Sequence, residues 1–242
     1  MFNPQAPTSE ASTRSLVFRQ ALAAAFKSRR QNLPPAPASL PALLTGCQTG
    51  VQGLLGRPGC RDALGEIRAR LFHSPGRDAE AQTWWHESVA SAVFAVRVAQ
   101  LKQASVPASF LGALLHRSGE ALALKILARV ELEYRMKLDS RSRRDWCTSH
   151  APELAERLIR TWNLSRRAGE CVLGWMQFRE LTELSGESAA VYFGRLFAIE
   201  CLQPRFCVPG ALDHAAAELG LSADDVAQVR QEEARSLIRA LD

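Results

Sequence analysis

Apolar residues recur every three or four positions over long stretches of this chain, and this spacing constrains its fold more than any other feature. Between residues 79 and 101 it places one set of apolar side chains on a single face of a helix. The set comprises Trp85, Val89, Ala92, Val93, Val96, Ala99 and Leu101. No segment shows the alternation of apolar and polar residues, rich in β-branched side chains, that is typical of strands. We therefore predict an all-α protein, a multi-helix bundle that forms one globular unit.

Prolines organise the N-terminal part of the chain. A helical pattern over residues 12–30 ends where four prolines follow within residues 32–41. Proline has no amide hydrogen and restricts the residue before it to extended backbone, so we expect an extended connector there. We predict three parts: an N-terminal helix (1–32), a proline-rich connector with short helices (33–78), and a helical core with the C-terminal helices (79–242).

Helix breakers and caps set the boundaries of the other predicted helices. Gly119 is expected to interrupt the helical pattern, and Pro152 is expected to stand at the start of a helix. Ser222 and Asp225, with Gly220 just before them, fit a capping box that follows a helix C-terminus. The predicted helices are 42–55, 62–72, 108–116, 121–138, 153–162, 165–184, 188–202, 211–219 and 222–241.

The composition is that of an ordinary globular protein, with 47% hydrophobic and 23% charged residues among 242. No run of about 18 apolar residues is present to span a bilayer, and the N-terminus lacks the basic and apolar regions of a signal peptide. We therefore expect a cytoplasmic protein with no membrane partner. The six cysteines form no Cys-x-x-Cys pair, so we predict neither a disulfide framework nor a zinc site.

The formal charge of +5 arises from 30 basic and 25 acidic residues, an imbalance too mild to indicate a nucleic-acid partner. One local stretch is strongly basic and contains Arg135, Lys137, Arg141, Arg143 and Arg144. These side chains could bind an anion or the acidic face of a partner. The alternative is a solvated loop after a helix C-terminus, where cations complement the helix dipole.

Residues 216–226 have the alanine, glycine and valine spacing of a DNA-binding helix-turn-helix. The charge of the second helix argues against that role. It carries Asp224, Asp225 and two further glutamates, with Arg230 as the main cation nearby, and a phosphate backbone attracts the opposite sign. A DNA-binding regulator therefore stays an alternative interpretation.

Three separate segments together suggest a family. The segment 85–88 reads Trp-His-Glu-Ser, the segment 114–119 reads Leu-Leu-His-Arg-Ser-Gly, and His150 is followed by Trp-Asn-Leu at 162–164. Their order and spacing resemble the HDOD domain, a helical regulatory relative of the HD metal-dependent phosphohydrolases. The resemblance covers about residues 81–177, and it implies an HD-like bundle with a role in bacterial signal transduction.

The metal-binding residues of catalytic HD proteins are largely missing from the matching positions. Such proteins hold divalent cations with histidines and carboxylates, and the cations activate a water molecule. Here His116 stands at the motif histidine, Arg117 replaces the motif aspartate, and Glu87 occupies an upstream histidine position. A guanidinium about 4 Å from a divalent cation would cost about 8 kcal/mol at an effective dielectric constant of 20, so Arg117 would have to point elsewhere.

The resemblance therefore implies a vestigial pocket formed by Glu87, His116, Arg117 and His150, with no metal and no catalytic residue. Such a pocket could still bind a small anion through Arg117. The alternative for the two histidines is a structural role in the core, with His150 packed beside Trp146 or Trp162.

We therefore expect a non-catalytic HDOD-like regulatory module that acts through protein–protein or small-ligand binding, with a protein partner in a signalling pathway. We expect no cofactor and no nucleic-acid partner. One alternative is an active HD-type phosphohydrolase that uses Glu87, His116 and His150 with a further carboxylate. The other is the helix-turn-helix regulator.

Overall fold

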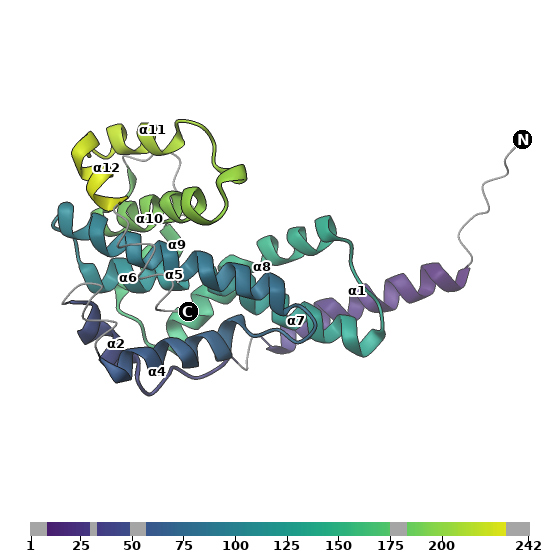
Figure 1. The fold of residues 1–242 in the computed structure, drawn as a ribbon. Helices are drawn as coiled ribbons and strands as arrows, with labels where there is room; N and C mark the ends of the chain where they lie inside the picture. The colour runs from purple at the N-terminus through teal and green to yellow at the C-terminus, as the bar shows by residue number, and fades with distance from the viewer. Residues whose placement is uncertain (1–8, 30–32, 49–56, 175–182, 231–242) are drawn as a thin grey trace, which may run out of the picture.

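The computed structural model describes residues 9–29, 33–48, 57–174 and 183–230, and this part of the chain is helical without any strand (Figure 1). The N-terminal elements are α1 (Ser9–Arg29), α2 (Leu40–Cys47), α4 (Pro58–Ile67) and the π-helical turn η1 (Arg68–Phe72). The central elements are α5 (Asp78–Leu101), α6 (Val106–Leu115), α7 (Ser118–Tyr134), α8 (Ser140–Thr161) and α9 (Arg166–Gly174). The C-terminal elements are α10 (Gly186–Leu202), the 3₁₀ turn η3 (Pro204–Phe206), α11 (Ala211–Glu218) and α12 (Ala223–Val229).

The long helix α5 forms the centre of the core. It packs against α10 and α6, while α7 packs against α8. The apolar face predicted for this helix is buried, because Trp85, Val89, Val93 and Val96 are each at most 2% exposed. The all-α prediction and the predicted core helix are both confirmed.

The N-terminal helix α1 packs against α7 and projects beyond it at its N-terminal end (Figure 1). Phe18, Leu22 and Phe26 recur every four residues and are fully buried, which explains why this segment docks on the body of the protein. The proline-rich connector is also held in place. The indole nitrogen Nε1 of Trp162 donates a 2.9 Å hydrogen bond to the carbonyl oxygen of Pro34.

The predicted break between the two helices is present, but it lies at His116 and Arg117, so its assignment to Gly119 was wrong. Helix α7 begins at Ser118 and includes Gly119 in its first turn. A Cβ atom at Gly119 would lie 2.1 Å from the carbonyl oxygen of Ala151 in α8. The glycine is therefore required for the close approach of α7 and α8, not for a break between helices.

Pro152 does not stand at a helix start either. Helix α8 begins at Ser140, and Pro152 lies inside it. The side chain of Asp139 caps this helix, because it accepts hydrogen bonds from the backbone nitrogens of Arg141 (3.0 Å) and Ser142 (2.9 Å). Helix α7 ends at Tyr134, before the predicted residue 138, where the next residue adopts a left-handed backbone with φ of 51°.

The capping box at the start of α12 is confirmed. The Ser222 hydroxyl accepts a 3.1 Å hydrogen bond from the backbone nitrogen of Asp225, whose carboxylate accepts one of 2.8 Å from the Ser222 nitrogen. Gly220 has a φ of +63°, as its predicted position after a helix C-terminus requires. Three predicted helical segments, at 49–55, 175–182 and 231–241, lie outside the described residues.

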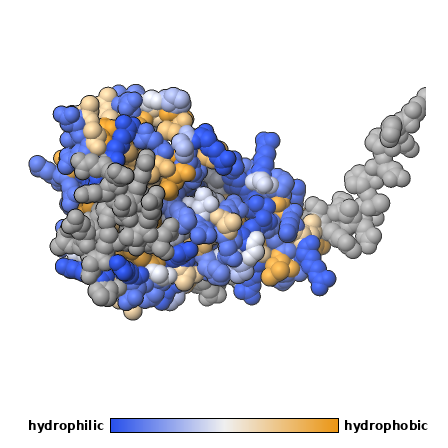
Figure 2. Space-filling view, viewed as in Figure 1, coloured by the Kyte–Doolittle hydropathy of each residue, from blue (hydrophilic) through white to orange (hydrophobic). Residues whose placement is uncertain are grey.

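The described surface is largely hydrophilic in the view of Figure 2, with small apolar patches. The large apolar side chains that are exposed belong to two regions, α1 with the C-terminal end of α7, and the connection from α10 to α11. They are Leu16, Val17, Leu132, Tyr134, Leu202, Phe206 and Val208. Among the described helices, none is long and apolar enough to cross a membrane.

Candidate functional site

The buried carboxylate of Glu87 is the centre of the candidate site. Glu87 lies in the middle of α5, and only 2% of the residue is exposed. Arg117 binds both of its oxygens, because Nη2 of Arg117 lies 3.0 Å from Oε1 and 2.9 Å from Oε2. Its Nε lies 3.3 Å from Oε1. This two-pronged geometry is the strong form of an arginine–carboxylate pair.

Arg117 stands at the turn between α6 and α7, where it precedes the first residue of α7. Its Nη1 donates a 2.8 Å hydrogen bond to Glu120 in the first turn of α7. Its guanidinium carbon also lies 5.9 Å from the ring centroid of Trp84. The sequence led us to expect that Arg117 would point away from a bound metal, whereas its guanidinium faces the carboxylate itself.

His116 is enclosed beside the same carboxylate and has no exposed side-chain surface. Its Nδ1 lies 2.6 Å from the carbonyl oxygen of Ala113, so we assign the ring proton to Nδ1, which donates to that oxygen. Its Nε2 lies 3.6 Å from Oε1 of Glu87. Burial lowers the pKa of His116, and Arg117 and Arg195 lower it further against the opposing effect of Glu87. The imidazole is therefore neutral near pH 7.

Arg195 of α10 completes the cluster, with its Nε 3.3 Å from Oε1 of Glu87. Burial by itself would raise the pKa of Glu87, but the guanidinium of Arg117 stabilises the charged carboxylate, and that pKa lies far below its ordinary value. Two carboxylates, Glu87 and Glu120, thus face two guanidinium groups, and the cluster is electrically balanced with a neutral histidine.

The sequence motifs did not mark Arg195, because α10 lies outside the segments that carry them. Its place beside Glu87 depends on how closely α10 packs on α5. A Cβ atom at Gly194 would lie 2.5 Å from the carbonyl oxygen of Ser91, so the preceding glycine permits this approach. A glycine followed by arginine on a buried helix face is the one signal in the sequence that could have indicated Arg195.

His150 makes its contacts elsewhere, at the junction of α1 and α8. Its ring stacks on Trp146, with centroids 4.8 Å apart and an interplanar angle of 6°, and lies 4.2 Å from the ring of Phe26. Its Nδ1 lies 2.9 Å from the carbonyl oxygen of Trp146. Trp146 is one of the two packing partners that the sequence suggested.

The residues at this site do not fit a divalent cation. In the described part of the chain, no three His, Cys, Asp or Glu side chains are grouped so that they could hold a metal ion. The carboxylate that would ligate such an ion, Glu87, already binds the guanidinium of Arg117. Arg117 is in turn shared with Glu120, so it also offers no uncompensated positive charge to a small anion.

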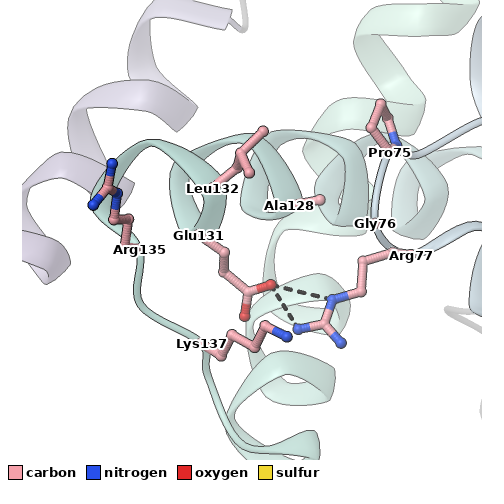
Figure 3. Close-up of a pocket in the computed structure, with 8 residues that line it drawn as sticks. All are labelled: Pro75, Gly76, Arg77, Ala128, Glu131, Leu132, Arg135 and Lys137. Carbon is pink, nitrogen blue, oxygen red and sulfur yellow. Dashed lines mark hydrogen bonds and ion pairs between the residues drawn. The ribbon is translucent and has the colours of Figure 1, made fainter.

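The basic stretch between Arg135 and Arg144 is divided by the fold. Arg143 turns inward, where it donates a 2.8 Å hydrogen bond to the carbonyl oxygen of Leu138 and approaches Glu80. Arg141 and Arg144 are exposed on α8. Arg135 and Lys137 line a separate cavity of about 610 Å³, together with Arg77 and Glu131 (Figure 3).

The helix pair α11–α12 shows contacts that favour a structural role. The guanidinium of Arg230, the main cation available to a nucleic acid there, is bound by Glu200 at 2.9 Å. Asp225 serves the capping box of α12, and Asp224 beside it is exposed. A phosphate backbone would therefore meet negative charge on this helix.

Comparison with known proteins connects this geometry to a family. Residues 63–174 match the HDOD domain model. This segment is an HDOD domain. It runs from α4 to α9 and contains Glu87, His116 and Arg117, while Arg195 lies beyond it.

The structure as a whole, including the HDOD domain, is also similar to a solved one. That protein is a candidate metal-dependent phosphohydrolase from Shewanella amazonensis SB2B, with a TM-score of 0.64 and 12% sequence identity. The likeness covers 93% of this chain and 99% of the other. At this identity it shows the fold alone, an HD-like helical fold. No curated protein matched the chain.

Proposed function

We propose that this protein is a non-catalytic regulatory module that acts in signalling by binding a protein partner. The HDOD domain supports the general class, and the absence of hydrolysis is inferred from the site. The observation that carries the proposal is the bond between Glu87 and Arg117. The carboxylate at the centre of the site binds a guanidinium, whereas a hydrolase of the HD type would need its carboxylates to bind a cation.

Electrostatics argue against the alternative of an active phosphohydrolase. Arg117 is bound by Glu87 at 2.9 Å and by Glu120 at 2.8 Å, so it is held at the carboxylate from two sides. A divalent cation about 4 Å from this guanidinium would be repelled by about 8 kcal/mol at an effective dielectric constant of 20. A metal could bind only if Arg117 were displaced, which would leave Glu120 without this partner.

An assay of hydrolysis tests the proposal. The wild-type protein and His116→Ala are incubated with bis(p-nitrophenyl) phosphate in the presence of Mn²⁺ or Fe²⁺. We expect both proteins to release nitrophenol at the rate of the metal solution alone. Metal-dependent turnover by the wild-type protein that disappears in His116→Ala would identify it as a hydrolase and refute the proposal.

A further inference from the structure

A second site lies away from the Glu87 cluster, at the end of the molecule where α7 meets α8. Its cavity of about 610 Å³ is within the range of ligand pockets in proteins. Three elements line it: the turn before α5 (Pro75, Gly76 and Arg77), the C-terminal half of α7 (Ala128, Glu131 and Leu132), and the connection from α7 to α8 (Arg135 and Lys137). Figure 3 shows these side chains around the hollow.

The cavity carries an excess of positive charge. Its one carboxylate, Glu131, is 6% exposed and is fully engaged. One oxygen accepts a 2.7 Å hydrogen bond from the backbone nitrogen of Leu138, and the other binds Arg77 at 2.7 Å and 3.2 Å. Arg77 therefore neutralises Glu131. The charges of Arg135 and Lys137 remain, and both residues are exposed.

Figure 3 shows how the two remaining cations are arranged. The Lys137 ammonium group points toward the Arg77–Glu131 pair, and Arg135 stands at the other end of the lining, beside the C-terminus of α7. Arg135 holds a left-handed backbone with φ of 51°, a conformation that glycine or asparagine adopts at less cost. Arg135 thus stands at a position where the backbone does not favour an arginine.

Apolar side chains are exposed at the rim of this cavity and on α1. Leu132 lines the cavity and is 74% exposed, and Tyr134, two residues further along α7, is 40% exposed. The Tyr134 ring meets that of Phe18 at a centroid distance of 6.3 Å, which joins this surface to α1. Beside Phe18, Leu16 and Val17 are also exposed. The exposed Leu132 at the rim therefore offers an apolar contact beside the charged cavity.

We propose that this cavity binds an acidic segment of a partner protein, with carboxylates against Arg135 and Lys137 and an apolar side chain against Leu132. Charge complementarity selects the acidic residues, and the apolar rim selects a peptide over a small inorganic anion. This inference rests on the proposed regulatory function, because it names the chemistry of the partner.

The test begins with a phage library of random dodecapeptides selected against the full-length protein. We expect the selected peptides to share Asp or Glu residues next to an apolar residue. A fluorescein-labelled copy of the best peptide is then titrated by anisotropy. Arg135→Glu/Lys137→Glu should weaken its binding by about tenfold or more, because both recognising charges are reversed. Leu132→Ser, at an exposed position, should also weaken it.

The matched control is Arg141→Glu/Arg144→Glu, which reverses the same number of exposed charges on α8, outside the cavity. Its affinity for the peptide should stay within about twofold of wild type if the cavity is the binding site. Equal losses in both double variants would show only a general charge effect and would overturn the proposal. A phage selection that yields no acidic peptides would also overturn the proposal.

A competition experiment distinguishes a cavity that binds a peptide from one that binds a small anion. If millimolar inorganic phosphate displaced the labelled peptide and Leu132→Ser bound as wild type, the cavity would be a small-anion site and the proposal would fail. The regulatory proposal would survive that failure, because the hydrolysis assay tests it independently at Glu87 and His116.

Discussion

Arg117 is the residue whose chemistry differs most from that of a metal site. Its guanidinium is held between Glu87 and Glu120, inside a cluster that also contains His116 and Arg195. The substitution of arginine for the motif aspartate could be read from the sequence, and so could the position of Glu87. The pairing of these two residues could not, because nothing in the motif indicates which way a long side chain turns.

Removal of Arg117 should destabilise the protein strongly. Arg117→Met keeps most of the side-chain volume but leaves the buried Glu87 with less compensation, and we expect a loss of about 3 kcal/mol in the free energy of unfolding at pH 8. Glu87→Gln/Arg117→Met removes both charges and should recover most of that loss. Urea denaturation followed by circular dichroism measures both values. A double variant no more stable than Arg117→Met would argue against a charge pair.

The free energy of unfolding of the wild-type protein and that of Arg117→Met should depend on pH in opposite directions. In the wild-type protein the pKa of Glu87 is lowered, so its stabilising contribution is present above the ordinary glutamate pKa of about 4.3 and is lost in stronger acid. In Arg117→Met we expect burial to raise this pKa above the unfolded value. The folded variant then binds more protons than the unfolded chain, so its stability rises as the pH falls.

The deficit of Arg117→Met relative to wild type should therefore be largest near pH 8 and smaller near pH 5. Denaturation curves of both proteins at the two pH values provide the measurement, with the double variant as the control that has lost this titration. An equal deficit at both values would contradict the assignment of Glu87 as the uncompensated group.

At the scale of elements, the sequence predicted most helices and misplaced those boundaries that tertiary contacts set. The four-residue spacing of α1 and the apolar face of α5 are local patterns, and both proved correct. Gly119 instead lies in the first turn of α7, where it permits the close approach to Ala151, and Pro152 lies inside α8. The position of Arg195 was missed for a related reason, since it follows from the packing of α10 on α5.

Gly119→Ala should show that this glycine serves the close packing of two helices, because alanine otherwise favours a helix over glycine. Its Cβ atom would lie 2.1 Å from the Ala151 carbonyl oxygen, so α7 and α8 must move apart, at a cost of about 3 kcal/mol in the free energy of unfolding. Gly65→Ala in α4 is the matched control, because nothing lies within 4 Å of its Cβ position. There alanine should stabilise the helix by about 0.5–1 kcal/mol. Thermal denaturation measures the stability of both variants. A Gly119→Ala variant as stable as the wild-type protein would contradict the close approach of α7 and α8.

At the scale of the whole molecule, an HD-like helical fold is combined with a balanced charge cluster at its core. In this cluster the Glu87 carboxylate binds the guanidinium of Arg117. The surface away from this cluster, with the cavity between the C-terminal half of α7 and the turn before α5, then provides the candidate binding site (Figure 3). The central claim is that the Glu87–Arg117 pair takes the place of a metal ion.

Metal content tests this claim most directly. The protein is purified without chelators, and iron, manganese and zinc per chain are measured by plasma mass spectrometry, with His116→Ala prepared in parallel. The Glu87–Arg117 pair predicts far less than one metal ion per chain in both samples. A near-stoichiometric metal in the wild-type protein that is lost in His116→Ala would contradict it.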